Sequence, residues 1–309
     1  MMPQTARSAL CPSRPVRCAC IDIGSNTTRL LVADVGRAGG GAPLVAPLLE
    51  RRAFTALGRA CRVDAPLPAA AREALVRIVR EQVAEAYSLG SETLRVVATA
   101  ALRRAADGLA TCHALAAAAG APVELLSEVE EARLAFAGAT CDLHDAAAGP
   151  LAVVDVGGGS TQLVVGTCAA GAAWSRSLPL GTGDLTAAHL RADPPAAAEL
   201  LALRAAVAQL LAGVVAPPVV RALAVGGSAT SLRRLAGARL DVPGLERALA
   251  TLRSAPAAVV AERVGIAPER ARLLPAGIVV LAALAERLGP LEIARGGLRE
   301  GVLRQLAVD

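Results

Sequence analysis

The chain has 309 residues, of which 54% are hydrophobic and 19% are charged, and its formal net charge is +5. This length suffices for two domains that each have their own core, and the modest positive charge favours an anionic substrate. The arginines are scattered and the chain holds only one Trp, one Tyr and two Phe. This composition argues against nucleic-acid binding, because bases need aromatic side chains on which to stack.

The same sequence argues against three classes of protein: membrane proteins, exported proteins and zinc-binding proteins. No stretch is long and apolar enough to span a membrane, and residues 1–17 lack the apolar segment of an export signal. We therefore expect a cytoplasmic protein with no membrane partner. Seven cysteines at irregular spacings and three histidines predict reduced thiols rather than a zinc site. The chain has no lysine, so all 32 basic residues are arginine, whose planar guanidinium binds phosphate in a bidentate manner.

The first half of the chain alternates between predicted strands and helices. Its predicted elements are a loose tail over 1–15, a β-rich region over 17–52 with a hairpin or loop at 39–41, a helix over 68–89, a strand over 94–98, a helix over 101–119 and a strand over 123–126. The helix over 68–89 is predicted from apolar residues at helical spacing, and Gly90 after them marks its end. This order favours parallel strands joined by crossover helices.

The second half follows a polar linker at 142–150 and repeats the plan of the first. Its predicted elements are strands near 172–178 and 221–225, helices near 229–236 and 276–288, a strand over 291–294 and a helix from Leu298. We therefore predict a duplicated α/β fold with its ligand in the cleft between the copies. The boundaries that we expect are an N-terminal domain over 16–128 and a C-terminal domain over 129–309, with the helix at 298–309 packing back on the N-terminal domain.

One short motif occurs twice. Residues 21–32 read IDIGSNTTRLLV and residues 154–165 read VDVGGGSTQLVV, so that Asp22 matches Asp155 and Gly24 matches Gly157. Each copy predicts a strand, a tight turn and a strand. Glycines let backbone amides approach an anion closely, and an Asp at the strand end can hold a hard cation. A single copy could be an ordinary hairpin, but two copies facing each other would grip a polyphosphate and its metal.

Two further segments carry candidate groups. Gly226 and Gly227 follow a strand and open a helix, where backbone amides suit an anion; the alternative is an ordinary helix start with a Ser/Thr cap. Ser127 and Glu130 fit a capping box, which leaves the adjacent Glu131 without a structural explanation. Glu131 shares a helical face with apolar residues, so one interpretation is a half-buried carboxylate whose raised pKa lets it act as a base. The alternative interpretation is a solvated glutamate at the start of the helix.

Arginines stand near the proposed phosphate site as well. Arg103 and Arg104 lie at a strand-to-helix junction, where the helix dipole disfavours cations, and this misfit favours a functional role for at least one of them. The alternative is a pair of surface arginines. Arg29 directly follows the first glycine turn.

These motifs, in this order, resemble the exopolyphosphatase and guanosine pentaphosphate phosphohydrolase (Ppx/GppA) family. The segments that carry the resemblance are 22–26 (DIGSN), 98–103 (ATAALR), 127–134 (SEVEEARL), 155–161 (DVGGGST), 177–181 (SLPLG), 225–230 (VGGSAT), 274–277 (LPAG) and 297–301 (GLREG). The resemblance implies the fold of actin, the Hsp70 ATPase domain and sugar kinases. That fold consists of two duplicated ribonuclease-H-like domains with the active site in the interdomain cleft.

The resemblance also implies roles for residues of this chain. Glu131 would be the base that activates water, Asp155 would hold Mg²⁺ with Asp22 assisting through water, and Gln162 would stand at a metal or water position. The phosphate clamp would comprise Ser25, Asn26, Arg29, Arg103, Gly157, Gly158, Gly159, Ser160, Gly226 and Gly227. Such chemistry depends on positioning and on charge stabilisation at the phosphoryl oxygens.

The chain departs from the family pattern at three positions. Gln162 replaces the Glu of Gly-Gly-Gly-Ser-Thr-Glu, Asp184 stands where relatives often carry Arg, and Arg104 stands where they tend to have Asp. Gln cannot take a proton, so we expect slower turnover or a changed metal preference. Because the sequence stops soon after Gly301, we expect it to lack the additional C-terminal domains that the resemblance associates with long exopolyphosphatases.

The resemblance leads to a Mg²⁺-dependent phosphohydrolase that releases terminal phosphate from inorganic polyphosphate, guanosine pentaphosphate or both. The alternative is a low-turnover protein that senses guanosine tetra- or pentaphosphate, and a kinase of the same superfold is a weaker third hypothesis. The resemblance is also compatible with a homodimer.

Overall fold

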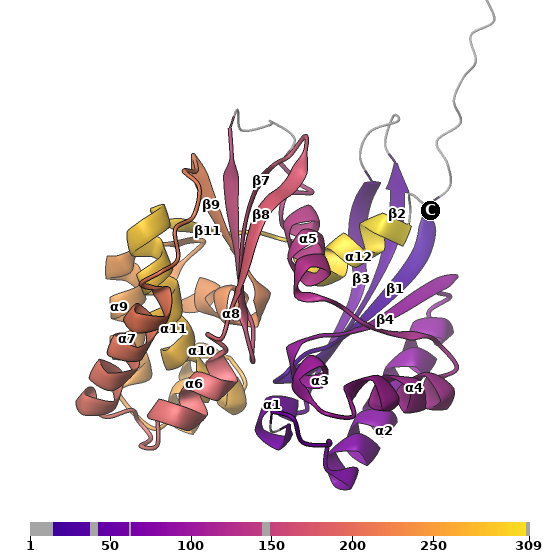
Figure 1. Ribbon diagram of the computed structural model, residues 1–309, viewed down its shortest axis with the longest axis horizontal. Coiled ribbons are helices and arrows are strands. Elements are labelled where there is room, and N and C mark those ends of the chain that lie inside the picture. The colour runs from indigo at the N-terminus through magenta and orange to yellow at the C-terminus, as the bar shows by residue number, and fades with distance from the viewer. Residues whose placement is uncertain (1–14, 38–42, 62, 144–148, 307–309) are drawn as a thin grey trace, which may run out of the picture.

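The computed structural model describes residues 15–37, 43–61, 63–143 and 149–306, and it shows two lobes, each built on a β-sheet (Figure 1). The predicted tail over 1–15, except residue 15, and the predicted turn at 39–41 lie outside these residues. The first sheet has the order β3-β2-β1-β4-β5. Its strands are β1 (Val16–Ile23), β2 (Thr27–Arg37), β3 (Pro43–Phe54), β4 (Thr93–Ala98) and β5 (Val123–Leu125).

The second sheet has the order β10-β11-β9-β6-β7-β8. Its strands are β6 (Leu151–Val156), β7 (Thr161–Thr167), β8 (Gly171–Leu178), β9 (Arg221–Val225), β10 (Arg239–Leu240) and β11 (Leu291–Ile293). In both sheets the first three strands form an antiparallel meander, and the first strand also pairs in parallel with the fourth. The predicted duplicated α/β fold is therefore confirmed.

Strand β1 shows why the central strands of the sheets, such as β1 and β6, read as nearly continuous apolar runs. Because side chains alternate across a strand, Ala19, Ile21 and Ile23 enter one core cluster while Cys18 and Cys20 enter another. Helices cover both faces, so neither set can be polar. The six cysteines among the described residues are free, as predicted from their spacing.

The helices of the first lobe are α1 (Leu57–Ala60), α2 (Ala69–Ser88), α3 (Ala100–Arg104) and α4 (Gly108–Ala119), and α5 (Glu128–Ala139) follows them and packs against the second sheet. The prediction of one helix over 101–119 is wrong, because α3 and α4 are separate. The Asp107 carboxylate between them accepts hydrogen bonds from the Leu67 N–H and the Arg72 guanidinium. A Cβ on Gly108 would lie 1.9 Å from the Leu102 carbonyl oxygen, so the chain turns tightly here. The contacts of Asp107 with Leu67 and Arg72, which lie far away along the chain, therefore interrupt the helix between α3 and α4.

The helices of the second lobe are α6 (Thr182–His189), α7 (Ala197–Leu211), α8 (Gly226–Ala236), α9 (Val242–Leu252), α10 (Ala257–Val264) and α11 (Pro268–Leu288). The start predicted at 276 is wrong, since α11 begins eight residues earlier with a proline in its first turn and also accommodates Pro275. Proline is well suited to a helix start because it has no N–H to leave unpaired. Helix α8 likewise begins at Gly226 rather than at 229.

The C-terminal helix α12 (Leu298–Leu306) returns to the first lobe and packs beside α5 and β1 (Figure 1). Its Leu298, Val302 and Leu303 join the cluster that holds Cys18 and Cys20. The start of α12 lies very close to α5. A Cβ on Gly138 of α5 would lie only 1.9 Å from the carbonyl oxygen of Gly297, the residue before α12. Helix α5 also packs on β6, β7 and β8 of the second sheet. The domain boundary between 128 and 129 stays a prediction, and no helix among the described residues is long and apolar enough to cross a membrane.

Candidate active site

The repeated motif forms two hairpins with the same internal geometry. The Gly24 N–H donates to the Thr27 carbonyl at 3.0 Å, and the Gly157 N–H donates to the Ser160 carbonyl at 3.0 Å. The strand register places Arg29 opposite Asp22 in the first hairpin and Gln162 opposite Asp155 in the second. The two copies are therefore structural as well as sequence repeats.

The two turns face each other at short range. A Cβ on Gly158 would lie 2.6 Å from the Asn26 side chain, and a Cβ on Gly159 would lie 2.5 Å from the Ser25 hydroxyl. The Asn26 side-chain amide donates to the Thr182 hydroxyl at 3.3 Å, which links the first lobe to α6 of the second. Only glycine permits this approach, so the glycine turns meet across the lobes as the sequence predicted.

These turns border a cavity of about 60 Å³ between the lobes. The predicted site residues that line it are Asp22, Ser25, Asn26, Arg29, Glu131, Asp155, Gly157, Gly158, Gly159, Ser160, Gly226 and Gly227. The peptide N–H groups of the two turns, at Ser25, Asn26 and residues 158–160, have no hydrogen-bond partner in the part of the chain that the structure describes. Unpaired backbone N–H groups beside a cavity are suited to an anion.

Glu131 reaches the cavity from the first turn of α5. Ser127 caps this helix through the Glu130 N–H, as predicted, but the Glu130 carboxylate pairs with Arg133 instead of completing the capping box. Glu131 is only 9% exposed, and its Oε2 accepts from Arg103 at 2.7 Å. Burial raises its pKa to about 7, against the opposing effect of Arg103. A carboxylate with a pKa near neutrality can act as a general base.

Asp155 and Asp22 stand at equivalent strand ends on the two sides of the cavity. The Asp22 carboxylate accepts from Arg29 at 2.7 Å, whereas Asp155 has no side-chain partner among the described residues. Burial, and then the negative charge of Asp22 against the opposing effect of Arg29, raise the pKa of Asp155 to about 6. Its Oδ1 occupies the space that a Cβ on Gly226 would fill, at 2.3 Å. An unpartnered carboxylate in this setting fits a hard divalent cation.

Two predicted site residues do not line the cavity. Gln162 is 1% exposed and lies beneath the second turn, where its amide nitrogen donates to the Ser160 and Ser177 hydroxyls while its Oε1 is buried without a partner. Arg103 donates to the Leu126 carbonyl and to Glu131, so it contacts the proposed base. A direct metal role for Gln162 and a direct phosphate role for Arg103 stay predictions.

The other two departures from the family pattern contact each other. Arg104 of α3 forms an ion pair with Asp184 of α6, which joins the two lobes beside the glycine turns. Neither residue lines the cavity. The negative charge of Asp184 is therefore paired with an arginine of the other lobe and lies outside the cavity.

The sequence reasoning missed Arg270, which lines the cavity from α11. It is 5% exposed, its side chain has no hydrogen bond or ion pair to a described residue, and its Nε is buried without a partner. Its guanidinium lies 5.7 Å from the centre of the Phe54 ring. Burial, together with repulsion from Arg52 and Arg29, lowers its pKa to about 9. No local signal distinguishes this arginine from the other 31.

Comparisons with known proteins identify the family of this chain. The model of the Ppx/GppA phosphatase family matches residues 31–308. The chain is 32% identical to exopolyphosphatase 1 of Mycobacterium leprae over 94% of this chain and 90% of the relative. It also superimposes on the crystal structure of an Aquifex aeolicus Ppx/GppA family member with a TM-score of 0.76 and 26% identity, over 95% and 98% of the two chains.

A further solved structure, an exopolyphosphatase from Cytophaga hutchinsonii, shares the fold with a TM-score of 0.80 at 18% identity, over 94% and 98% of the two chains. The family model covers most of the chain, and the glycine hairpins, Glu131 and Asp155 meet at one cavity. The chain belongs to the Ppx/GppA phosphatase family.

Proposed function

We propose that this protein is a Mg²⁺-dependent phosphohydrolase that releases terminal orthophosphate from inorganic polyphosphate. Its family membership makes it a hydrolase that acts on phosphoanhydride bonds. The observation that carries the proposal is the buried Glu131 carboxylate, which shares a small cavity with Asp155 and with the unpaired N–H groups of two glycine turns. This set comprises a base, a cation ligand and a phosphate cradle.

The residues would divide the work as follows. The N–H groups of the turns, with Arg270, would bind the oxygens of the terminal phosphoryl group and stabilise the charge that develops on them. Because Arg103 occupies Oε2 of Glu131, its Oε1 would accept the proton of the attacking water. Asp155 would hold Mg²⁺, with Asp22 assisting through water. The bound cation would neutralise charge on the transferred group.

Guanosine pentaphosphate is a second candidate substrate, because it presents the same terminal phosphoanhydride. A low-turnover sensor of guanosine tetra- or pentaphosphate is the alternative that Gln162 favours, since this residue cannot take a proton. The position of Gln162 beneath the turn rather than in the cavity weakens that alternative. A homodimer and a cytoplasmic location are proposals that rest on the family resemblance and on the sequence.

Phosphate release by the purified protein tests the function. We expect release from long-chain polyphosphate with Mg²⁺ and none after chelation with EDTA. A parallel reaction with guanosine pentaphosphate tells which substrate is faster. No release from either substrate, together with clear binding of guanosine tetraphosphate, would establish the sensor and overturn the proposal.

The acidic limb of the pH profile should depend on Glu131 and Arg103. As the pH falls through about 7, Glu131 becomes protonated and can no longer accept a proton, so kcat/KM should fall. Arg103→Gln removes the cation that opposes the raised pKa, and the limb should therefore move to higher pH. Arg104→Gln is the matched control, because Arg104 pairs with Asp184. A limb at the same pH in both variants would contradict the role of Arg103 and Glu131 as a coupled pair.

A further inference from the structure

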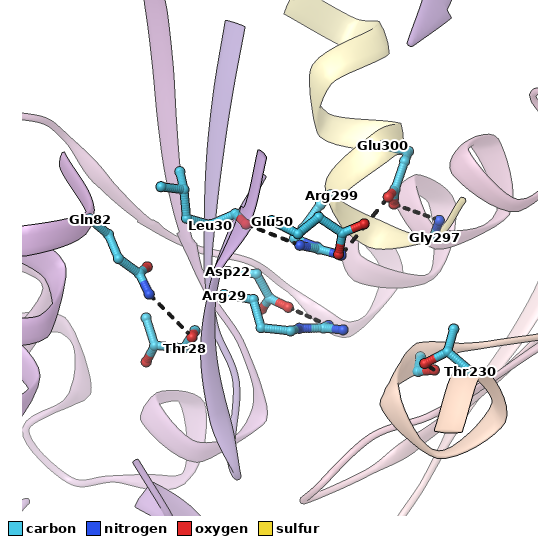
Figure 2. Close-up of polar contacts among 11 residues, drawn as sticks. Asp22, Thr28, Arg29, Leu30, Glu50, Gln82, Thr230, Gly297, Arg299 and Glu300 are labelled. Carbon is cyan, nitrogen blue, oxygen red and sulfur yellow. Dashed lines mark hydrogen bonds and ion pairs between the residues drawn. The ribbon is translucent and has the colours of Figure 1, made fainter. Parts of the chain in front are cut away.

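One ion pair crosses between the two lobes beside the glycine turns. Arg104, the last residue of α3, donates from its Nη1 to Oδ2 of Asp184 in the first turn of α6, at 2.5 Å. Among the residues that the structure describes, it is the only ion pair between the segment before α5 and the segment that follows α5 and precedes α12. The pair of Arg29 with Asp22, by contrast, joins two strands of one sheet (Figure 2). The Arg104–Asp184 pair is therefore placed to fix one lobe against the other.

The first turn of α6, which carries Asp184, is fastened to the second glycine turn. The Thr182 N–H donates to the Gly157 carbonyl at 3.0 Å, and the Gly183 N–H donates to the Gly158 carbonyl at 2.8 Å. These bonds engage the carbonyls of the glycine turn and leave its unpaired N–H groups for a ligand. A movement of Asp184 therefore reaches the phosphate cradle through two short hydrogen bonds.

Helix α3 carries two successive arginines that reach different parts of the site. Arg103 donates to Oε2 of Glu131 at 2.7 Å, whereas Arg104 donates to Asp184. Ala100, the first residue of the same helix, lines the cavity. One helix of five residues thus contacts the proposed base directly and the second glycine turn through Asp184.

The guanidinium of Arg104 depends on Asp184 for its position. Its Nε and Nη2 are buried without a hydrogen-bond partner among the described residues, so the bond to Asp184 is the one that its side chain makes there. Its Nη2 lies 2.9 Å from the position that a Cβ on Gly159 would take, and Oδ1 of Asp184 lies 3.5 Å from the corresponding position at Gly58 of α1. A buried cation with a single partner is destabilised strongly when that partner is lost. The pair and the backbone around it therefore form one tightly packed contact between the lobes.

We infer that Arg104 and Asp184 are positioning residues for the hydrolysis, because their ion pair fixes the second glycine turn relative to Glu131. This inference rests on the proposed function, in which the turn binds the terminal phosphoryl group and Glu131 activates the water. Attack in line requires the water and the phosphorus at a defined separation, and a misplacement of about 1 Å can cost about a hundredfold in rate. The pair acts on the rate, since the N–H groups that bind the anion belong to the turn itself.

Reversal of each charge tests the pair. Arg104→Asp sets two carboxylates against each other and Asp184→Arg sets two guanidinium groups against each other, so each variant should lower kcat for phosphate release about tenfold or more. The double variant, Arg104→Asp with Asp184→Arg, restores an opposite-charge pair of the same combined length. Its kcat should return to within about threefold of the wild type, because the two substitutions compensate each other.

Two further measurements separate positioning from binding and from proton transfer. In a Glu131→Gln background, which blocks turnover, the single variants should bind pyrophosphate within about twofold of their parent, because the turn keeps its N–H groups. With Glu131 intact, the acidic limb of the pH profile should stay in place, since Arg103 rather than Arg104 contacts Glu131.

Arg204→Asp is the matched control, because Arg204 pairs with Glu246 inside the second lobe and is also partly exposed. It makes the same charge change as Arg104→Asp and should leave kcat unchanged. Urea unfolding of every variant reports any loss of stability. If a reversal variant does not fold, Asp184→Asn removes the charge without added bulk and should still lower kcat.

Three outcomes would overturn the inference. They are wild-type kcat in both single variants, a double variant no faster than the singles, and a loss of pyrophosphate binding in proportion to the loss of kcat. A lower free energy of unfolding with unchanged kcat belongs to the first of these and would assign the pair to the fold alone. Failure of the proposed function is distinguishable, since the wild-type protein would then release no phosphate before any variant is compared.

Discussion

Glu131→Gln should reduce phosphate release by about 10²–10⁴-fold, the usual contribution of a general base. Gln has the size of Glu and can still accept a hydrogen bond from Arg103, but it cannot take a proton from water. The cavity and its unpaired N–H groups stay in place, so polyphosphate affinity should change little. The measurement is kcat for phosphate release, set beside the dissociation constant of the chain.

The matched control is Glu130→Gln, one residue earlier on the same helix. The Glu130 carboxylate pairs with the exposed Arg133 and does not line the cavity. Its substitution should leave kcat unchanged. Equal losses in the two variants would show that the effect comes from the start of α5 and would argue against Glu131 as the base.

Arg270→Met should weaken substrate binding and stabilise the free protein at the same time. Loss of a charge-assisted contact to phosphate costs about 1.5–3 kcal/mol, which corresponds to roughly a tenfold to hundredfold rise in KM. In the unliganded fold, however, the Nε of this guanidinium is buried without a hydrogen-bond partner, and the group is repelled by Arg29 and Arg52. Its removal should therefore raise the free energy of unfolding, by about 1–2 kcal/mol.

Arg272→Met, two residues further on α11, is the control with the opposite signs. Its guanidinium donates to the carbonyls of Leu190 and Ala192, each at 2.6 Å, so removal leaves these acceptors unpaired. This variant should lower the free energy of unfolding and keep the wild-type KM. Urea unfolding and steady-state kinetics on both variants provide the comparison, and a destabilised Arg270→Met protein with unchanged KM would show that Arg270 serves the fold.

Several parts of the site could be read from the sequence because they depend on local chemistry. A strand, a glycine turn and a second strand are specified within a dozen residues, and the period of two places Asp22 and Asp155 at the ends of their strands. The face that Glu131 shares with Leu134 and Ala135 follows from the helical period. Repetition of the motif then predicted two hairpins that face one cavity.

Other features depend on partners far along the chain. The break between α3 and α4 follows from contacts of Asp107 with Leu67 and Arg72, which no local period reveals. Gln162 lies beneath its turn because Ser177 of the neighbouring strand β8 accepts its amide hydrogen bond. The pairing of Arg104 with Asp184 joins two lobes.

The sequence by itself determined the duplicated α/β plan, the two glycine hairpins and the position of Glu131, because strand and helix periods and glycine turns act over a few residues. Only the tertiary structure decided that Arg270 reaches the cavity. An arginine carries the same charge wherever it stands in the chain. Whether that charge is buried, paired or left free for a ligand is set by the packing of segments that lie more than a hundred residues apart.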